Sequence, residues 1–436
     1  RIIEKVLDIK PDLIGFSAYT GNYRWCLKIA QDIKKKCDIP IVFGGIHTTS
    51  VPKRVLANDF VDFAIIGEGE FAMLDLVKHI EKKAAPEELL ELPNICFKHK
   101  DNVHISAPRP HASELDIFPF PDKGLFYNKV PLFEEKYTII TSRGCQFNCT
   151  YCCNNVYQRL YSREKIHFFR RSPDNVIKEL LAVKNRGRSK TIVFVDDVFV
   201  HSRSWLAEFI EKYKKQIKIP FTCLAQPTSI TKEVASLLKE GGCCLISLGI
   251  QSWSERIRKD IFHRPGSSEQ IVKAVSYIME QGIKISVDNI FGAPTETEDD
   301  LKQGLEFYKQ IKTNRIYTFW LTFYPKTDII DCAKKHGILS DKDIDNIEEG
   351  FSGYAHDVGS VGIDKINIYA KYELLFQLAS FIRNKVLFST IANFVIFIPF
   401  KKIISKLILV LNALKNKDPQ ILPTLKYLLG TRKNVP

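Results

Sequence analysis

Short apolar runs alternate with amphipathic stretches along the first 85 residues. The apolar runs predict buried strands at residues 12–17, 40–44 and 62–66. Apolar residues recur with helical spacing between them, which predicts helices at residues 2–9, 25–37, 51–58 and 70–82. Because strands and helices alternate, we expect residues 1–90 to form a parallel, doubly wound α/β domain.

The ends of these predicted strands are rich in small residues. Ligands of parallel sheets bind at the carboxyl ends of the strands, and glycine lets a ligand approach the backbone closely. The candidate ligand-binding residues are Ser17, Gly44, Gly45, His47, Gly67, Glu68 and Gly69. For His47 we favour a hydrogen-bonded loop histidine over a metal ligand.

Residues 91–136 read as a hairpin at 94–106 followed by a proline-rich linker. Beyond them the alternation resumes. Strands are predicted at residues 137–142, 191–196, 219–225, 244–249, 283–290 and 316–323, and helices at 173–185, 203–215, 231–241, 268–281 and 297–311. Six strand–helix units favour a closed or partly closed parallel barrel over residues 137–330, with functional loops after the strand ends.

Residues 331–436 predict a helical C-terminal region. Residues 372–383 have a helical pattern, and residues 386–400 carry no charge. Fifteen residues are fewer than the roughly 20 that span a bilayer, and Pro399 interrupts them. We therefore expect this region either to pack against the barrel or to lie in a membrane interface.

Composition narrows the class of protein. The chain has 436 residues, of which 45% are hydrophobic and 26% charged, so it can form two or three packed domains and is not a disordered chain. The net charge of +13 suits an anionic substrate, a nucleic acid or an anionic membrane, as well as an ordinary basic surface. Since the sequence begins with Arg1 rather than Met, we expect a fragment or a processed form that lacks an N-terminal part.

Four of the eleven cysteines fall within nine residues: Cys145, Cys149, Cys152 and Cys153. In a reducing compartment such a cluster points to a metal site or to catalysis. Thiolates at Cys145, Cys149 and Cys152 can hold three corners of an iron–sulfur cluster and leave one iron open. A zinc site completed by Cys153 or a nearby histidine is the alternative, but a loop at the mouth of a barrel strand is an unusual place for a structural zinc.

This motif resembles the signature of the radical S-adenosylmethionine (SAM) superfamily, in which a C-x3-C-x2-C loop follows the first barrel strand. Further segments that resemble the family occur in order at residues 194–199, 247–252, 289–296 and 324–327. Many relatives have Glu where this chain has Gln251, and Lys326 replaces a family Gly. The resemblance implies that Cys145, Cys149 and Cys152 bind a [4Fe-4S] cluster. It implies SAM contacts from Tyr151, Asp196, Asp197, Gln251, Ser252, Ile290 and Gly292, and Arg264 is a candidate for a carboxylate. The implied chemistry is reductive cleavage of SAM to methionine and a 5′-deoxyadenosyl radical.

The N-terminal part resembles the cobalamin-binding domain that precedes the barrel in one large subgroup of this superfamily. The resemblance rests on Ser17-x-Tyr19, Gly44-Gly45-x-His47-Thr48 and Gly67-Glu68-Gly69-Glu70. It implies that the strand-end residues given above bind cobalamin. The subgroup includes methyltransferases that act on unactivated carbon or phosphorus and the anaerobic magnesium-protoporphyrin ester cyclase.

The resemblance leaves two main functions open, methylation of an unactivated centre and a cyclisation or oxidative rearrangement. A degenerate cluster-binding module is disfavoured by the intact cysteines, and a nucleic-acid modifier by the absence of a second cluster motif. We expect a small-molecule or lipid substrate, a flavodoxin or ferredoxin as reductant, and no nucleic acid. We expect a cytoplasmic protein, and peripheral membrane contact through the C-terminal helices stays open as the alternative to their packing against the barrel.

Overall fold

The computed structural model divides the chain into two compact units, each assembled from segments that are distant in sequence. The first unit contains Arg1–His111, Asn148–Lys165 and Trp320–Ser360, and the second contains Ala112–Phe147, Ile166–Phe319 and Val361–Pro436. Residues described are 2–100, 102–127, 129–162, 168–311, 313–351, 366–382, 384–395, 399 and 401–425.

The first unit is built on a five-stranded sheet with the order β1-β2-β3-β4-β5. The strands are β1 (Ile14–Ser17), β2 (Ile41–Gly44), β3 (Phe63–Ile65), β4 (Ile95–His99) and β5 (Asn102–Ile105). The first three strands pair in parallel, and the β4–β5 hairpin adds antiparallel to β3. The predicted hairpin therefore extends the N-terminal sheet, which sequence patterning alone did not indicate.

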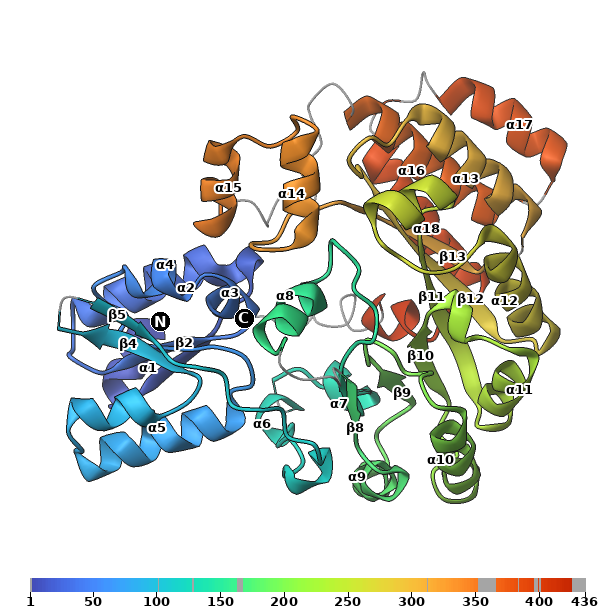
Figure 1. Ribbon diagram of the computed structural model, residues 1–436. Coiled ribbons are helices and arrows are strands. Elements are labelled where there is room, and N and C mark those ends of the chain that lie inside the picture. Colours follow the sequence, from blue (N-terminus) through green and yellow to red (C-terminus); the bar gives the residue numbers. More distant parts are fainter. Residues whose placement is uncertain are drawn as a thin grey trace. The chain divides into compact units, whose positions relative to one another are not determined.

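Helices cover both faces of this sheet (Figure 1). Successive side chains of a strand point to opposite faces, so neighbouring residues Val42 and Phe43 enter two different apolar clusters. The Phe43 cluster includes α2 (Thr20–Lys34) and α4 (Pro52–Leu56), and the Val42 cluster includes α5 (Glu70–Lys82). The remaining elements before β4 are α1 (Ile2–Ile9), α3 (Ile46–Ser50) and the 3-10 helix η1 (Pro86–Glu91).

Three later helices complete the first unit: α8 (Cys153–Leu160), α14 (Asp328–Lys335) and α15 (Asp341–Glu348). Asp328, the first residue of α14, accepts hydrogen bonds from Asn155 and Arg159 of α8. Arg54 of α4 forms ion pairs with Asp345, Glu348 and Glu349 at α15. These polar contacts hold the two ends of the first unit's sequence together.

The second unit contains a six-stranded sheet with the order β13-β12-β11-β10-β9-β6 (Figure 1). The strands are β6 (Lys136–Ile139), β9 (Thr191–Phe194), β10 (Phe221–Ala225), β11 (Cys243–Gln251), β12 (Lys284–Phe291) and β13 (Arg315–Trp320). Pairing is parallel from β6 through β12. Since β6 and β13 are the two edges, the sheet is an open, partial barrel.

The helices between these strands begin and end where local sequence signals place them. They are α9 (Pro173–Arg186), α10 (Arg203–Gln216), α11 (Lys232–Glu240), α12 (Ser268–Glu280) and α13 (Glu298–Gln310). Ser172 caps the first turn of α9, Pro173 occupies its first position, and Gly187 ends it with a φ of 71°. In the same way Thr297 and Asp300 form a capping box at α13.

Other elements of the second unit frame the barrel. A short ribbon pairs β7 (Ser142–Gly144) with β8 (Phe168–Arg170). The linker region holds η2 (Leu115–Ile117), α6 (Gly124–Tyr127) and α7 (Leu132–Glu135), while η3 (Pro227–Ser229) and η4 (Ile257–Ile261) follow β10 and β11.

The C-terminal helices of the second unit are α16 (Ile366–Phe381), α17 (Lys385–Phe394) and α18 (Lys401–Lys415). Helix α16 packs against α13 and α18. Lys417, Asp418 and Gln420, which follow α18, lie against the amino-terminal ends of strands. Arg315, the first residue of β13, is buried and pairs with Asp418 at 2.8 Å, and Gln420 accepts a bond from Lys136 through its carbonyl at 2.7 Å. This tail covers one end of the barrel and leaves the carboxyl ends for ligands.

The predicted fold class is confirmed: an α/β chain with a doubly wound N-terminal sheet, a partial parallel barrel and a helical C-terminal region. The six predicted barrel strands all form. Residues 396–398 and 400 of the predicted uncharged run lie outside the described residues.

Candidate functional site

The carboxyl ends of the barrel strands carry most of the predicted SAM residues. Asp196 and Asp197 follow β9, Gln251 ends β11 and Ser252 follows it. Ile290 lies near the end of β12 and Gly292 directly follows that strand. Parallel pairing brings these strand ends to one edge of the sheet, as the sequence predicted.

Asp196 is wholly buried and uses one carboxylate oxygen to brace the chain before the cysteine loop. Its Oδ1 accepts bonds from the Thr141 amide and hydroxyl, both at 2.8 Å, and from the Ser142 hydroxyl at 2.5 Å. Its Oδ2 has no hydrogen-bond partner among the residues that the structure describes. A buried carboxylate oxygen without a partner is costly, so this atom is suited to a cationic group of a ligand. Asp197 is exposed.

Gln251 and Arg264 meet over Gly249. The Arg264 guanidinium donates to the Gly249 carbonyl at 2.6 Å. A Cβ built on Gly249 would lie 2.9 Å from both the Arg264 Nη2 and the Gln251 Nε2. Gln251 has a φ of 68°, a conformation that non-glycine residues rarely adopt. Such backbone strain is typical of sites where function fixes a side chain.

At β12 the amide of Gly292 donates to the Glu296 carboxylate at 2.8 Å, and Gly292 has a φ of 89°. The Gly-x-Pro-x-Glu segment therefore closes on itself into a tight loop. The structure places Ile290 half-buried beside it, and Ser252 is buried after β11.

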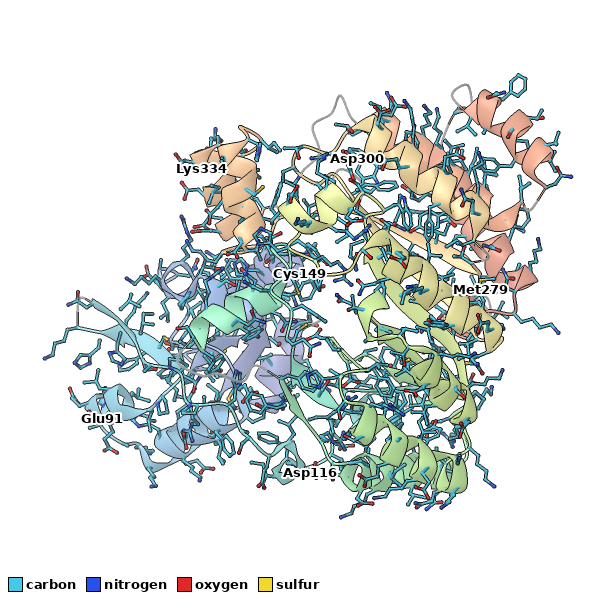
Figure 2. All side chains as sticks on the ribbon, turned by 45° about the vertical axis from the view of Figure 1, so that its right-hand side comes forward. Glu91, Asp116, Cys149, Met279, Asp300 and Lys334 are labelled. Atoms are coloured by element: carbon cyan, nitrogen blue, oxygen red, sulfur yellow. The ribbon has the colours of Figure 1, made fainter. Side chains whose placement is uncertain are left out.

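The cysteine loop connects β7 to α8 (Figure 2). Gly144 has a φ of 76°, which a residue with a side chain would adopt only with strain. The Phe147 amide donates to the Cys145 Sγ at 3.5 Å, and the Asn154 side chain to the Cys152 Sγ at 3.7 Å. Cys149 is 5% exposed, and its carbonyl accepts from the Cys152 amide at 3.1 Å.

These thiols fit an iron–sulfur cluster by their chemistry, because N–H donors aimed at sulfur favour the thiolate that binds iron. Within the described ranges, no three His, Cys, Asp or Glu side chains lie close enough together to hold a metal ion. Cys153 is the first residue of helix α8, and Tyr151 is half-buried in the turn before it.

The predicted cobalamin residues gather at the carboxyl edge of the first unit's sheet. Ser17 pairs with Gly44 across β1 and β2. The His47 amide donates to the Ala18 carbonyl at 3.1 Å, and the Gly67 amide donates to Thr49 at 3.0 Å. Three loops that are separate in sequence are thus joined into one surface.

Glycine serves two purposes on this edge. Gly45 and Gly67 have φ values of 90° and 70°, and a Cβ on either would lie under 3 Å from a neighbouring atom. A Cβ on Gly44 or Gly69 would meet nothing closer than 3.9 Å. The first pair shapes the loops, while the second leaves backbone open to a ligand, which fits a large flat cofactor such as cobalamin.

His47 is buried, which fits the hydrogen-bonded role favoured from the sequence. Its Nδ1 lies 3.1 Å from the Thr20 hydroxyl, and its ring stacks on Tyr23 at 3.9 Å. His47 as a whole is 1% exposed. Burial lowers the pKa of His47 to about 4, an effect that neighbouring Glu348 partly offsets.

We expect the burial of His47 to make stability depend on pH. Its pKa is lower in the folded state than the usual value of 6.5, so the unfolded state binds more protons between these values. The stabilisation is complete above pH 6.5 and is lost as the pH falls towards 4. When the pH is lowered from about 7 to about 5, the wild type should lose about 2 kcal/mol more unfolding free energy than His47→Gln, as measured by urea unfolding. Equal pH dependence of the two proteins would contradict the buried, neutral imidazole.

Helix α8, which follows the cysteine loop, contacts the same edge of the first unit. The Glu68 amide donates to the Tyr161 hydroxyl at 3.1 Å, directly after α8. His111 packs on the Tyr161 ring at 3.7 Å and lies 3.5 Å from the Glu68 carboxylate. The segment that follows the cluster motif is therefore tied to a loop predicted to bind cobalamin.

Two barrel residues were missed by the sequence analysis. Arg170 is stacked 3.6 Å from the Trp205 ring, and burial lowers its pKa to about 10, an effect that Asp196 opposes. Within the described chain its Nε and Nη1 have no hydrogen-bond partner. Burial also raises the pKa of Asp288 to about 6, against the lowering effects of Arg315 and Arg264. The one available signal for Asp288 was a carboxylate inside the apolar strand Lys284–Phe291.

The chain combines a partial parallel barrel and a three-cysteine loop with a doubly wound domain whose strand ends are rich in glycine. This combination is typical of an enzyme that uses an iron–sulfur cluster and a second cofactor. Comparison with known proteins agrees with this class. Residues 139–308 match the family model of the Radical SAM superfamily, and residues 1–77 match that of the B12 binding domain.

Individual relatives match over most of this chain. An uncharacterized methyltransferase of Pyrococcus horikoshii is 27% identical over 350 residues, which cover 78% of this chain and 72% of the relative. The anaerobic magnesium-protoporphyrin IX monomethyl ester cyclase of Rubrivivax gelatinosus is 25% identical over 73% of this chain, and the match spans only 59% of the cyclase. The structure of the cobalamin-dependent SAM radical enzyme OxsB superposes with a TM-score of 0.68 at 16% identity, covering 100% of this chain and 74% of OxsB.

The chain therefore belongs to the radical SAM superfamily, in the group whose members join the radical SAM domain to a B12-binding domain. It is an enzyme, and its cofactors are a [4Fe-4S] cluster, SAM and cobalamin.

Proposed function

We propose that this enzyme methylates an unactivated centre of a small-molecule or lipid substrate. The proposal rests on the combination of two features. One is the three-cysteine loop that follows the first strand of the barrel, and the other is the glycine-rich edge of the doubly wound sheet. The named methyltransferase relative, which matches over most of its length, supports the same choice.

In this proposal the residues of the barrel edge bind and orient SAM. Cys145, Cys149 and Cys152 hold the cluster. The unpartnered Oδ2 of Asp196 accepts from the SAM ammonium, while its Oδ1 keeps the chain before the cysteine loop in place. The remaining SAM contacts come from Tyr151, Asp197, Gln251, Ser252, Arg264, Ile290 and Gly292.

The first unit holds cobalamin in this proposal, over the backbone at Ser17, Gly44, Gly45, Gly67, Glu68 and Gly69. His47 shapes this surface from below, since its ring is buried. When bound, the cluster supplies the electron for reductive SAM cleavage, and cobalamin carries the methyl group. The protein's own part is to orient the reactants and to exclude water from them.

We further propose that a small acidic electron carrier such as flavodoxin or ferredoxin reduces the cluster, and that the enzyme works in the cytoplasm with its C-terminal helices against a membrane. An open iron is sensitive to oxygen, so we expect activity only under anaerobic conditions.

Product analysis under strict anaerobiosis tests the reaction. The chain would be reconstituted with iron, sulfide and cobalamin and then given SAM and a strong reductant. We expect mass spectrometry to detect both 5′-deoxyadenosine and S-adenosylhomocysteine, because a methyltransferase of this kind uses SAM both as a radical source and as a methyl donor. Cys153→Ala should behave as the wild type.

Deoxyadenosine without S-adenosylhomocysteine would favour a cyclisation or rearrangement instead. The magnesium-protoporphyrin ester cyclase among the relatives supports that second candidate. If a protein with a complete cluster formed neither product, this result would contradict both candidates under these conditions.

A further inference from the structure

Helix α18 buries two polar residues, Ser405 and Asn412, together with the apolar residues Ile408 and Ala413. Asn412 is 0% exposed and donates to the Ser380 hydroxyl of α16 at 2.8 Å. Ser405 is 2% exposed and donates to Glu373 of α16 at 3.2 Å. Because rotation of α18 would leave these buried groups without partners, the hydrogen bonds fix which side of the helix faces outward.

The outward side of α18 is apolar. Ile403, Leu407, Leu411 and Leu414 are 59%, 57%, 50% and 53% exposed. Their spacing of four, four and three residues places them in one row along the helix. Surface helices of globular proteins ordinarily bury such a row, so its exposure on α18 is unusual.

Helix α17 adds to the apolar surface of the same unit. Its Val386, Leu387 and Phe394 are exposed, and Val386 is 77% exposed. Only Phe388, among the described side chains of this helix, is buried. We call these three residues and the four of α18 the apolar face.

The sequence that contains the apolar face is strongly basic. Between Glu373 and Asp418 the sequence contains no acidic residue. It contains seven basic ones: Arg383, Lys385, Lys401, Lys402, Lys406, Lys415 and Lys417. Lys406 and Lys415 are exposed on α18, at either side of the leucine row. Lysine beside exposed leucine suits a surface that is apolar at depth and anionic at its boundary.

We infer that the apolar face of α17 and α18 binds the surface of an anionic lipid bilayer, with α18 lying in the headgroup region. No helix in the described ranges is long and apolar enough to cross a membrane, so the contact would be interfacial. A second copy of the chain is disfavoured as the occupant, since it would bring an equally positive face. This inference names the surface behind the proposed membrane contact and rests on that part of the proposed function.

Vesicle binding tests the inference with the full chain, in the absence of SAM and reductant. Vesicles of phosphatidylcholine with about 30% phosphatidylserine would be sedimented with the protein and compared with pure phosphatidylcholine vesicles. We expect binding to the anionic vesicles that weakens in high salt. The double variant Leu407→Asp, Leu411→Asp should lower the partition coefficient by roughly tenfold or more, since two exposed leucines lose their apolar contact with lipid.

The matched control is Val272→Asp, Met279→Asp on α12 of the same unit. These side chains are 46% and 40% exposed and lie one above the other on a helix outside the apolar face (Met279 is labelled in Figure 2). The control should bind vesicles as the wild type does, and circular dichroism should show that both double variants fold.

Two results would overturn the inference. One is equal vesicle binding by the wild type and the α18 variant. The other is absence of vesicle binding together with a concentration-dependent dimer that only the α18 variant loses, which would assign the face to a second copy. Because no cofactor takes part in this assay, its failure would leave the methyl-transfer test untouched.

Discussion

Cys149→Ala should lose the iron–sulfur cluster and all SAM cleavage. Three thiolates are the minimum set by which this loop can hold a four-iron cluster with one open iron, and removal of one leaves two irons without a protein ligand. Cys149 is also the most buried of the three, and its carbonyl accepts from the Cys152 amide. Iron and sulfide per chain, with the electron paramagnetic resonance spectrum of the reduced protein, measure the effect. The rate of deoxyadenosine formation should fall at least about a thousandfold, to background, because the reaction depends on the lost cluster.

Cys153→Ala is the matched control for this variant. Cys153 neighbours Cys152 in sequence but is the first residue of α8, so its loss should leave iron and sulfide nearly complete. If Cys149→Ala retained full iron and sulfide, or Cys153→Ala lost them, the ligand assignment from the C-x3-C-x2-C spacing would be wrong.

The sequence was most informative where a local pattern determines the structure. The barrel strands and helices follow from the period of apolar residues and from caps such as Ser172 and Thr297, which act over one or two turns. The strand-end residues also lie together as expected, because parallel pairing leaves no other place for them.

The contacts that escaped prediction join residues far apart in the chain. The β4–β5 hairpin reads locally as a two-stranded unit, and its pairing with β3 depends on a neighbour that precedes it by thirty residues. Asp328 with Asn155 and Arg54 with Glu348 are surface-type residues whose pairing no local period encodes. The burial of Ser405 and Asn412 on α18 could not be predicted from the sequence for the same reason, since their partners Glu373 and Ser380 lie on α16.

In the candidate site, too, the sequence predicted the positions of residues but not their contacts. Family segments placed Asp196 at a strand end, but its three hydrogen bonds to Thr141 and Ser142 depend on the neighbouring strand. The sequence analysis assigned no role to Arg170, and burial beside Trp205 is what sets it apart from an ordinary arginine. Burial and partnering are properties of the fold, so a pattern of residue types cannot supply them.

Gly45→Ala and Gly44→Ala should affect different properties, although the two glycines are adjacent. The first should lower stability, and the second should weaken cobalamin binding. Gly45 has a φ of 90° and a ψ of −179°, a conformation open essentially to glycine alone. A Cβ there would lie 2.6 Å from the Ala18 carbonyl oxygen, which is backbone and cannot move aside easily. We expect Gly45→Ala to lower the free energy of unfolding by about 3 kcal/mol, as strain and overpacking add. Urea unfolding measures this loss.

Gly44→Ala separates the shape of the loop from the binding of cobalamin. The new Cβ would meet Ile65 only at 4.0 Å, so we expect stability within about 1 kcal/mol of the wild type. The same methyl group would stand on backbone that the cofactor is proposed to approach, so the affinity for cobalamin, followed by its absorbance during titration, should fall roughly tenfold. Wild-type cobalamin affinity in a stable Gly44→Ala protein would mean that the cofactor does not cross this edge of the sheet. Because Gly44 and Gly45 differ only in backbone conformation and surroundings, the pair distinguishes a glycine needed by the fold from one needed by the ligand.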